Sequence, residues 1–178
     1  METGKLNWSA PAGDHSYSSP QLCTIADENL VLMLTNAGLD LLNPQTGAQR
    51  LVYPWEYRGY RVLQPQIVDG DSILISTGMG VGTRRIRVSN SDGKLAAKEL
   101  WTSRHLKPDF NDHVVHQDHC YGFDGAIFTC IDLASGKRTW KGGRYGKGQV
   151  LLLADSDLLL VGKRPPSPLN FFPSCQQF

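Results

Sequence analysis

A tryptophan that recurs at intervals of 39 to 47 residues is the feature that most limits what this chain can fold into. The four tryptophans are Trp8, Trp55, Trp101 and Trp140. Each follows a turn-like dipeptide that ends in glycine, and these glycines recur at 43, 46 and 43 residues: Gly4, Gly47, Gly93 and Gly136. A period in the forties is typical of one four-stranded blade of a β-propeller.

Each period repeats the same internal order of strands and turns. Short polar turns lead into apolar runs with β-type composition, namely LVLMLT, SILIST, HCYGF and LLLVGK. In the first three periods a glycine-containing turn, such as the loop 78–82, then leads into a further strand. Glycine supplies the positive φ that tight hairpin turns require. No segment has a helical period, so the sequence predicts an all-β chain.

The segment IDLASGKRTW resembles the signature of pyrroloquinoline-quinone (PQQ)-type propeller repeats. Its matching residues are Asp132, Gly136, Lys137 and Trp140. The first residues, TGKLNW, match the second half of the signature. Two looser copies, DLLNPQTGAQRLVYPW and VSNSDGKLAAKELW, carry four extra residues between glycine and tryptophan.

This resemblance implies a partial β-propeller of three to four four-stranded antiparallel blades, an incomplete ring similar to that of quinoprotein dehydrogenases. In such repeats the glycine closes the turn into the outer strand, and the tryptophan docks flat between neighbouring blades. A docked indole covers a large apolar area, and its N–H can reach a backbone carbonyl. The motif glycines and tryptophans are therefore expected to have structural roles.

The repeat divides the chain into a predicted propeller region and a tail. Residues 1–164 form the propeller region, with blades or blade remnants at 1–15, 16–60, 61–108, 109–145 and 146–164. Residues 165–178 carry four prolines and no strand pattern. Proline cannot donate to a sheet ladder, so we expect this tail not to continue the blade. The expectation is a fragment of a longer propeller with a disordered or frame-shifted tail.

Charge and hydropathy exclude two classes of partner. Lys and Arg number 18 and Asp and Glu 17, a net charge of +1, which predicts no nucleic-acid binding. No apolar stretch approaches the roughly 20 residues of a membrane-spanning helix. The N-terminus lacks a signal-peptide pattern, so we expect the chain expressed alone to stay in the cytoplasm. The resemblance implies instead that the parent protein is periplasmic or in the cell envelope.

His113, His116 and His119 form the one cluster with a metal-like composition. Residues three apart on a strand point to opposite faces, so His113 and His116 converge only if a bulge or loop intervenes near 117–118. They remain weak metal candidates, and no metal site is predicted. Cys120 and Cys130 either face each other across a hairpin or are separate strand thiols.

No catalytic or cofactor-binding set is found in the sequence. The glycine-rich loop 78–82 precedes a predicted strand, whereas a phosphate cradle needs a following helix. Quinoprotein dehydrogenases hold PQQ and calcium at the centre of a complete ring, usually against a vicinal disulfide, and this chain has no Cys-Cys pair. We therefore predict no cofactor, and PQQ with calcium enters only under the dehydrogenase alternative below.

The leading hypothesis is a non-catalytic segment of a bacterial cell-envelope protein that acts as a protein-interaction scaffold. It would bind other proteins through loops or blade edges. One alternative is a fragment of a PQQ-dependent alcohol or sugar dehydrogenase whose catalytic residues lie in other blades. A second is a truncated gene product without a function of its own. Exposed flanks of the end blades predict self-association.

Overall fold

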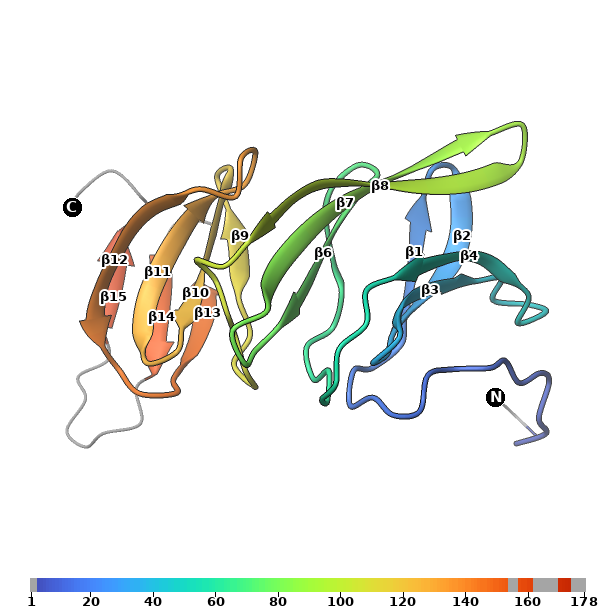
Figure 1. The fold of residues 1–178 in the computed structure, drawn as a ribbon, viewed down its shortest axis with the longest axis horizontal. Coiled ribbons are helices and arrows are strands. Elements are labelled where there is room, and N and C mark those ends of the chain that lie inside the picture. The colour runs from blue at the N-terminus through green and yellow to red at the C-terminus, as the bar shows by residue number, and fades with distance from the viewer. Residues whose placement is uncertain (1–2, 154–156, 162–169, 174–178) are drawn as a thin grey trace. The chain divides into compact units, whose positions relative to one another are not determined.

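The computed structural model describes residues 3–153, 157–161 and 170–173. These residues form fifteen strands and no helix, which confirms the all-β prediction (Figure 1). No helix in the described residues is long and apolar enough to cross a membrane.

The strands form four antiparallel sheets, and within each the strands follow one another in chain order. The first sheet contains β1 (Gln21–Ile25), β2 (Glu28–Leu34), β3 (Gly38–Leu42) and β4 (Gln49–Pro54). The second contains β5 (Gln66–Asp69), β6 (Ser72–Thr77), β7 (Gly82–Ser91) and β8 (Lys94–Ser103). The third contains β9 (Val114–His116), β10 (His119–Asp124), β11 (Ile127–Asp132) and β12 (Arg138–Arg144). The fourth contains β13 (Gln149–Leu153), β14 (Asp157–Val161) and β15 (Asn170–Pro173). A four-stranded antiparallel sheet of this order is the unit of a β-propeller.

The chain divides into two compact units, and the second sheet contributes to both. The first unit comprises Met1–Ile75 and Ile86–Glu99, and the second comprises Ser76–Arg85 and Leu100–Phe178. Alternation along β2 contributes to the core of the first unit. In β2, Leu30, Leu32 and Leu34 are fully buried, while the residues between them are half-buried.

Aromatic side chains dominate the core of the second unit. Phe128 in β11 lies 5.4 Å from Phe123 in β10 and 5.4 Å from Trp140 in β12, between ring centroids. Tyr121 and Cys130 complete this cluster. Rings at such distances in tilted arrangements attract one another in addition to the area that they bury.

The predictions for the glycine-rich loop 78–82 and for the cysteine pair can be compared with the structure. Residues 78–81 form a hairpin turn, and the strand β7 follows it, so no helix terminus is available to a phosphate there. The two cysteines do not face each other: Cys120 pairs with Ile131, and Cys130 pairs with Tyr121. Both side chains are buried, and burial raises the pKa of Cys120.

One expectation about the C-terminal segment is wrong. Prolines in 165–178 predicted no strand, yet β15 lies there and pairs with β14, with Phe172 opposite Leu158. β15 lies at the edge of its sheet, where the missing N–H of Pro173 removes no interior ladder bond. The remaining positions of this segment, and 162–164 before it, lie outside the described residues.

Candidate functional site

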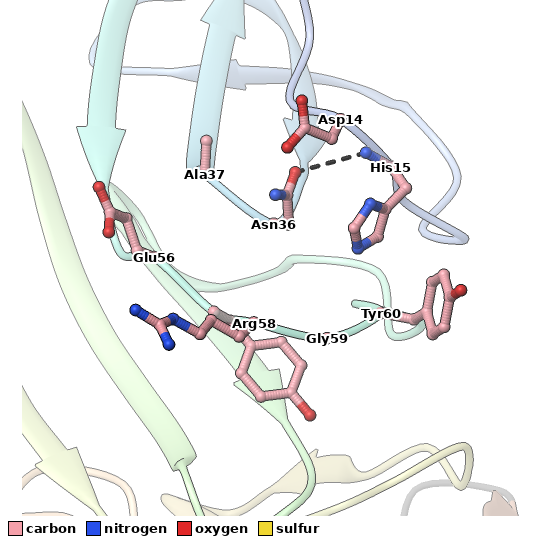
Figure 2. A pocket seen from close by; sticks show the side chains of 9 residues that line it. Asp14, His15, Asn36, Ala37, Glu56, Arg58, Gly59 and Tyr60 are labelled. Atoms are coloured by element: carbon pink, nitrogen blue, oxygen red, sulfur yellow. Dashed lines mark hydrogen bonds between the residues drawn. The ribbon is translucent and has the colours of Figure 1, made fainter.

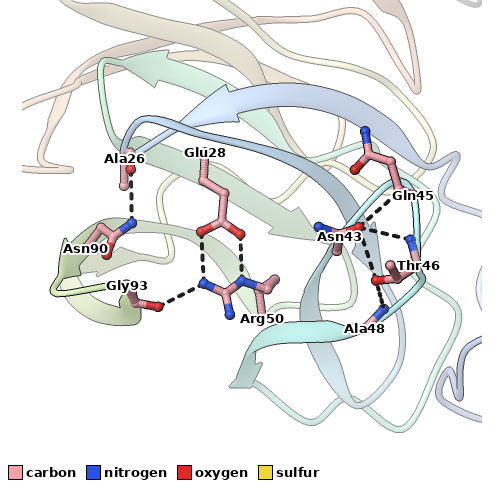
Figure 3. Close-up of polar contacts among 9 residues, drawn as sticks. All are labelled: Ala26, Glu28, Asn43, Gln45, Thr46, Ala48, Arg50, Asn90 and Gly93. Carbon is pink, nitrogen blue, oxygen red and sulfur yellow. Dashed lines mark hydrogen bonds and ion pairs between the residues drawn. The ribbon is translucent and has the colours of Figure 1, made fainter.

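The repeat motif builds the same turn twice. In the turn between β3 and β4, Asn43 Oδ1 accepts hydrogen bonds from the backbone N–H groups of Gln45 and Thr46, each 2.9 Å long (Figure 3). The Gly47 N–H donates to Asn43 O at 2.9 Å, and Gly47 has a φ of 70°. The Asn-x-x-Thr-Gly spacing therefore encodes a closed turn that satisfies its own backbone.

The turn between β11 and β12 has the same design. Asp132 Oδ1 accepts from the Ser135 N–H at 2.7 Å and from the Ser135 hydroxyl. The Gly136 N–H donates to Asp132 O at 2.8 Å, and Gly136 has a φ of 68°. The hydrogen bond from the Ser135 side chain lowers the pKa of Asp132. Lys137 donates its backbone N–H to the Ser135 hydroxyl at 3.3 Å.

Each of these turns receives the tryptophan of the preceding repeat. Trp8 Nε1 donates to Pro44 O at 2.9 Å, and a Cβ added at Gly47 would lie 2.4 Å from the Trp8 ring. Trp101 Nε1 donates to Leu133 O at 3.0 Å, and a Cβ at Gly136 would lie 2.7 Å from the Trp101 ring. Glycine is needed at both turns for its positive φ and for the close approach of the indole.

Trp55 and Trp140 are placed differently. The turn that corresponds to Gly47 in the next repeat is a two-residue turn at Asp92 and Gly93, with φ of 53° and 78°. A Cβ at Gly93 would meet nothing within 4 Å, so no indole docks there. Trp55 instead lies beneath the Arg61 guanidinium, 4.6 Å from its carbon, and Trp140 packs in the aromatic core. The fourth motif glycine, Gly4, has a φ of 63°.

Hydrogen bonds attach the hairpin of the two-residue turn to the first sheet, and an ion pair orients Arg50 for one of them. Arg50 Nε lies 2.6 Å from Glu28 Oε1, and Arg50 Nη2 donates to Gly93 O at 2.8 Å (Figure 3). The hydrogen bond to Glu28 raises the pKa of Arg50. Asn90 Nδ2 also donates to Ala26 O at 3.5 Å. These contacts lie within the first unit and are structural.

A second charge cluster lies in the other unit, around Asp124. Lys107 Nζ lies 2.6 Å from Asp124 Oδ1, Arg138 Nη2 lies 3.7 Å from Oδ2, and Lys141 bonds the same oxygen. Burial alone would raise the pKa of Asp124, but the hydrogen bonds from Lys107 and Lys141 outweigh it and lower the pKa. Three cations therefore surround one ionised carboxylate.

An open pocket with a volume of about 820 Å³ lies at one end of the first sheet (Figure 2). It forms where β2 ends, β3 begins and β4 ends, beside the segment that precedes β1. Its lining combines aromatic, charged and amide side chains: Asp14, His15, Asn36, Ala37, Glu56, Tyr57, Arg58, Gly59 and Tyr60. A volume of this size is typical of a binding site.

Backbone hydrogen bonds hold the three segments of the pocket together. The Asn36 N–H donates to His15 O at 3.3 Å, and the Tyr57 N–H donates to Asn36 O at 2.8 Å. Asn36 Oδ1 accepts from the His15 N–H at 3.4 Å (Figure 2). The Asn36 side chain and backbone thus connect the preceding and following segments.

Aromatic rings in tilted contact extend the pocket to solvent. The Tyr60 ring centroid lies 4.8 Å from that of His15 and 5.0 Å from that of Tyr17. Tyr17 is 66% exposed and Tyr60 is 58% exposed. Beneath this surface the buried Arg61 accepts, at its backbone carbonyl, the Tyr17 N–H at 2.8 Å. Two large exposed rings on a fixed base are characteristic of a protein-binding surface.

Sequence reasoning did not single out this pocket. Its residues come from three loops with no common motif, and only the aromatic-rich run WEYRGY at 55–60 marks one wall. The docking of that run against Asn36 depends on the sheet pairing, which a linear pattern does not specify.

The structure pairs two of the three histidines that the sequence grouped and places the third apart from them. His116 and His119 are direct cross-strand partners on β9 and β10. His113 precedes β9 and is buried beside Gly122, where an added Cβ would lie 3.0 Å from His113 Cβ. Within the described residues no three His, Cys, Asp or Glu side chains form a group that could hold a metal ion.

A comparison with known protein families finds none that matches this chain, and a comparison with curated proteins finds no match either. Among solved structures, the chain is similar to BamB from Moraxella catarrhalis, with a TM-score of 0.43 and 15% identity over 90% of this chain. It covers 65% of the BamB chain, which is less than two thirds of that length. A similarity of this size carries no statement about function, and the PQQ-type repeat family stays a prediction from the motif. The fold shown here is all-β, with successive four-stranded antiparallel sheets of the kind that form β-propeller blades.

Proposed function

We propose that the chain is a non-catalytic protein-interaction scaffold that binds a partner polypeptide at the pocket of the first sheet. The observation that supports this proposal is the group of aromatic rings in tilted contact, His15, Tyr17 and Tyr60, at the pocket rim. The two tyrosines are largely exposed although their rings are held in place. Tyrosine is enriched in protein interfaces because it adds a large contact area and loses little conformational freedom on binding.

The charges at the pocket also suit a polypeptide better than a small apolar ligand. Asp14, Glu56 and Arg58 place charges of both signs around one opening. A peptide backbone with mixed side chains can satisfy such a lining, whereas an apolar ligand would leave these charges without compensation. From the resemblance of the repeat, we propose that the protein lies in the cell envelope, which fractionation of cells that express it would test.

Site-specific photo-crosslinking tests the proposal. A photoreactive amino acid at position 60 should give an adduct with one discrete protein, because that side chain lies at the rim. The same group at Val52, which is 51% exposed on β4 and does not line the pocket, is the control and should not give this adduct.

Formation of the adduct should also depend on the two tyrosines at the rim of the pocket. With the photoreactive group at Arg58, also in the pocket lining, Tyr17→Ala combined with Tyr60→Ala should reduce adduct yield roughly tenfold or more, the loss of one or two interface hot spots. The proposal is wrong if no adduct forms at position 60, if Val52 gives the same adduct, or if the double variant retains it.

A further inference from the structure

His116 and His119 lie on either side of the two-residue turn Gln117-Asp118, which joins β9 to β10. Both turn residues have positive φ, 45° and 62°, as in the tightest class of hairpin turn. The two histidines are direct partners in the antiparallel register. Opposed residues of such a pair project from the same face, with Cβ atoms roughly 5 Å apart. The hairpin therefore brings two imidazoles together.

A backbone contact fixes which nitrogen of His119 is free. His119 Nδ1 lies 2.8 Å from Gln117 O. A carbonyl oxygen only accepts, so Nδ1 is the donor and carries the proton. In the neutral ring the lone pair is then on Nε2. Histidines that bind metal ions commonly donate their other ring N–H to a backbone carbonyl in this way, which orients the ring.

The facing histidine also has a nitrogen without a protein partner. His116 Nε2 is buried at the atom level and forms no hydrogen bond within the described residues. Leaving a buried ring nitrogen without a partner costs free energy that a bound ion or water would recover. His116 as a whole is half-buried.

We propose that His116 and His119 together bind a divalent transition-metal ion such as Cu²⁺, Ni²⁺ or Zn²⁺. Imidazole nitrogen is a preferred ligand of these ions, whereas Ca²⁺ and Mg²⁺ require oxygen ligands. Water fills the remaining coordination positions, because the described residues supply no third His, Cys, Asp or Glu to this pair. The site is therefore weaker than a four-ligand structural zinc site, and its affinity follows the order Cu²⁺ over Ni²⁺.

This inference is independent of the proposed partner-binding pocket, because the hairpin belongs to the second unit and the pocket to the first. It also revises the cluster that the sequence suggested. His113 is excluded, since it lies next to Gly122, beyond the three paired positions of β9 and β10.

Titration of the full, untagged chain with Cu²⁺ and with Zn²⁺ tests the proposal. Calorimetry should show one ion per chain, and electron paramagnetic resonance of the Cu²⁺ form should show two nitrogen ligands. His116→Gln and His119→Gln should each lower the affinity roughly tenfold or more and leave one nitrogen in the spectrum. Mg²⁺ should give no heat of binding.

His15→Gln is the matched control, since it removes a histidine of the first unit and should leave the affinity unchanged. Should a hairpin variant fail to fold, a second measurement uses the wild-type chain. Zn²⁺ should protect His116 and His119, and not His15, from modification by diethyl pyrocarbonate, as read by peptide mass spectrometry. The proposal is overturned if the wild-type chain binds no ion, if both hairpin variants bind as tightly as wild type, or if protection is absent.

Discussion

At the scale of single residues, His113 is a histidine enclosed by the second unit. It is 8% exposed, and neither ring nitrogen has a hydrogen-bond partner within the described residues. Burial lowers its pKa to about 4. Because the charged form cannot be solvated there, the folded chain holds this ring neutral at every pH above that value.

This burial predicts a specific loss of stability in acid. The unfolded chain binds a proton at His113 near pH 6.5, whereas the folded chain does not until about pH 4. The contribution of neutral His113 to the free energy of unfolding is therefore fully present above pH 6.5. It falls as the pH drops towards 4, by about 3 kcal/mol in total. Denaturant unfolding at pH 7.5 and pH 5 measures the loss. His113→Gln should lose less stability than wild type over this interval, and an equal loss in both would refute the assignment.

Residue types alone could not have separated this histidine from its neighbours. The sequence places His113, His116 and His119 at equal spacing and with similar surroundings. Their different environments arise from the turn at Gln117-Asp118, which sets the register of β9 against β10. A shift of one residue in that register would exchange the faces of all three.

At the scale of secondary-structure elements, the docked indoles give a test with an internal control. Gly136 and Gly125 have nearly equal φ, 68° and 65°. A Cβ at Gly136 would lie 2.7 Å from the Trp101 ring, whereas a Cβ at Gly125 would meet nothing within 4 Å. Gly125→Ala should therefore cost only the left-handed backbone penalty, about 1–2 kcal/mol.

Gly136→Ala should cost the same backbone penalty and roughly 1–3 kcal/mol more, because the ring must move. The difference between the two unfolding midpoints in urea measures this second contribution. Tryptophan fluorescence should also report a changed environment in Gly136→Ala alone. Equal destabilisation in the two variants would show that the indole does not dock on this turn.

The motif made part of this element-level structure predictable. Asp132 and Ser135 at their fixed spacing specify a turn, and Gly136 specifies its positive φ. The same pattern led us to expect docking of every motif tryptophan. Trp55 departs from this: the next repeat has a two-residue turn at Asp92-Gly93, where a Cβ on Gly93 would meet nothing within 4 Å, and Trp55 lies beneath the Arg61 guanidinium. Because Gly93 also has a positive φ, the glycine does not by itself specify docking.

At the scale of the whole molecule, exposed leucines lie on strands at sheet edges. Leu22 on β1 is 73% exposed, and Leu151 on β13 is 54% exposed. Apolar side chains beside unpaired backbone groups favour pairing with another chain. Sedimentation velocity should show association that increases with protein concentration.

Leu22→Lys together with Leu151→Lys should shift this association towards the monomer, because charges on an edge strand oppose pairing. Leu6→Lys is the control, since Leu6 is 82% exposed and lies outside the strands. A wild-type chain that is monomeric at all concentrations, or a control as effective as the double variant, would contradict the expectation.

The all-β class and the succession of sheets were predictable because they depend on local patterns that recur with a fixed period. The pocket was not, because residues from 14–15, 36–37 and 56–60 meet only after the strands have paired. Likewise, β15 was missed because proline content was weighed without its position at a sheet edge. Local signals therefore specified the elements, while the contacts between loops needed the structure.

The docking of Trp101 on the turn 132–136 bears on how such a chain grows by gene duplication. A duplicated segment that carries both an indole and a receiving turn contains both partners of this docking contact. A tandem copy of such a segment would dock its indole on the turn of the neighbouring copy without new mutations. A copy that begins between the two would carry an indole without its receiving turn, and its stability would depend on other contacts.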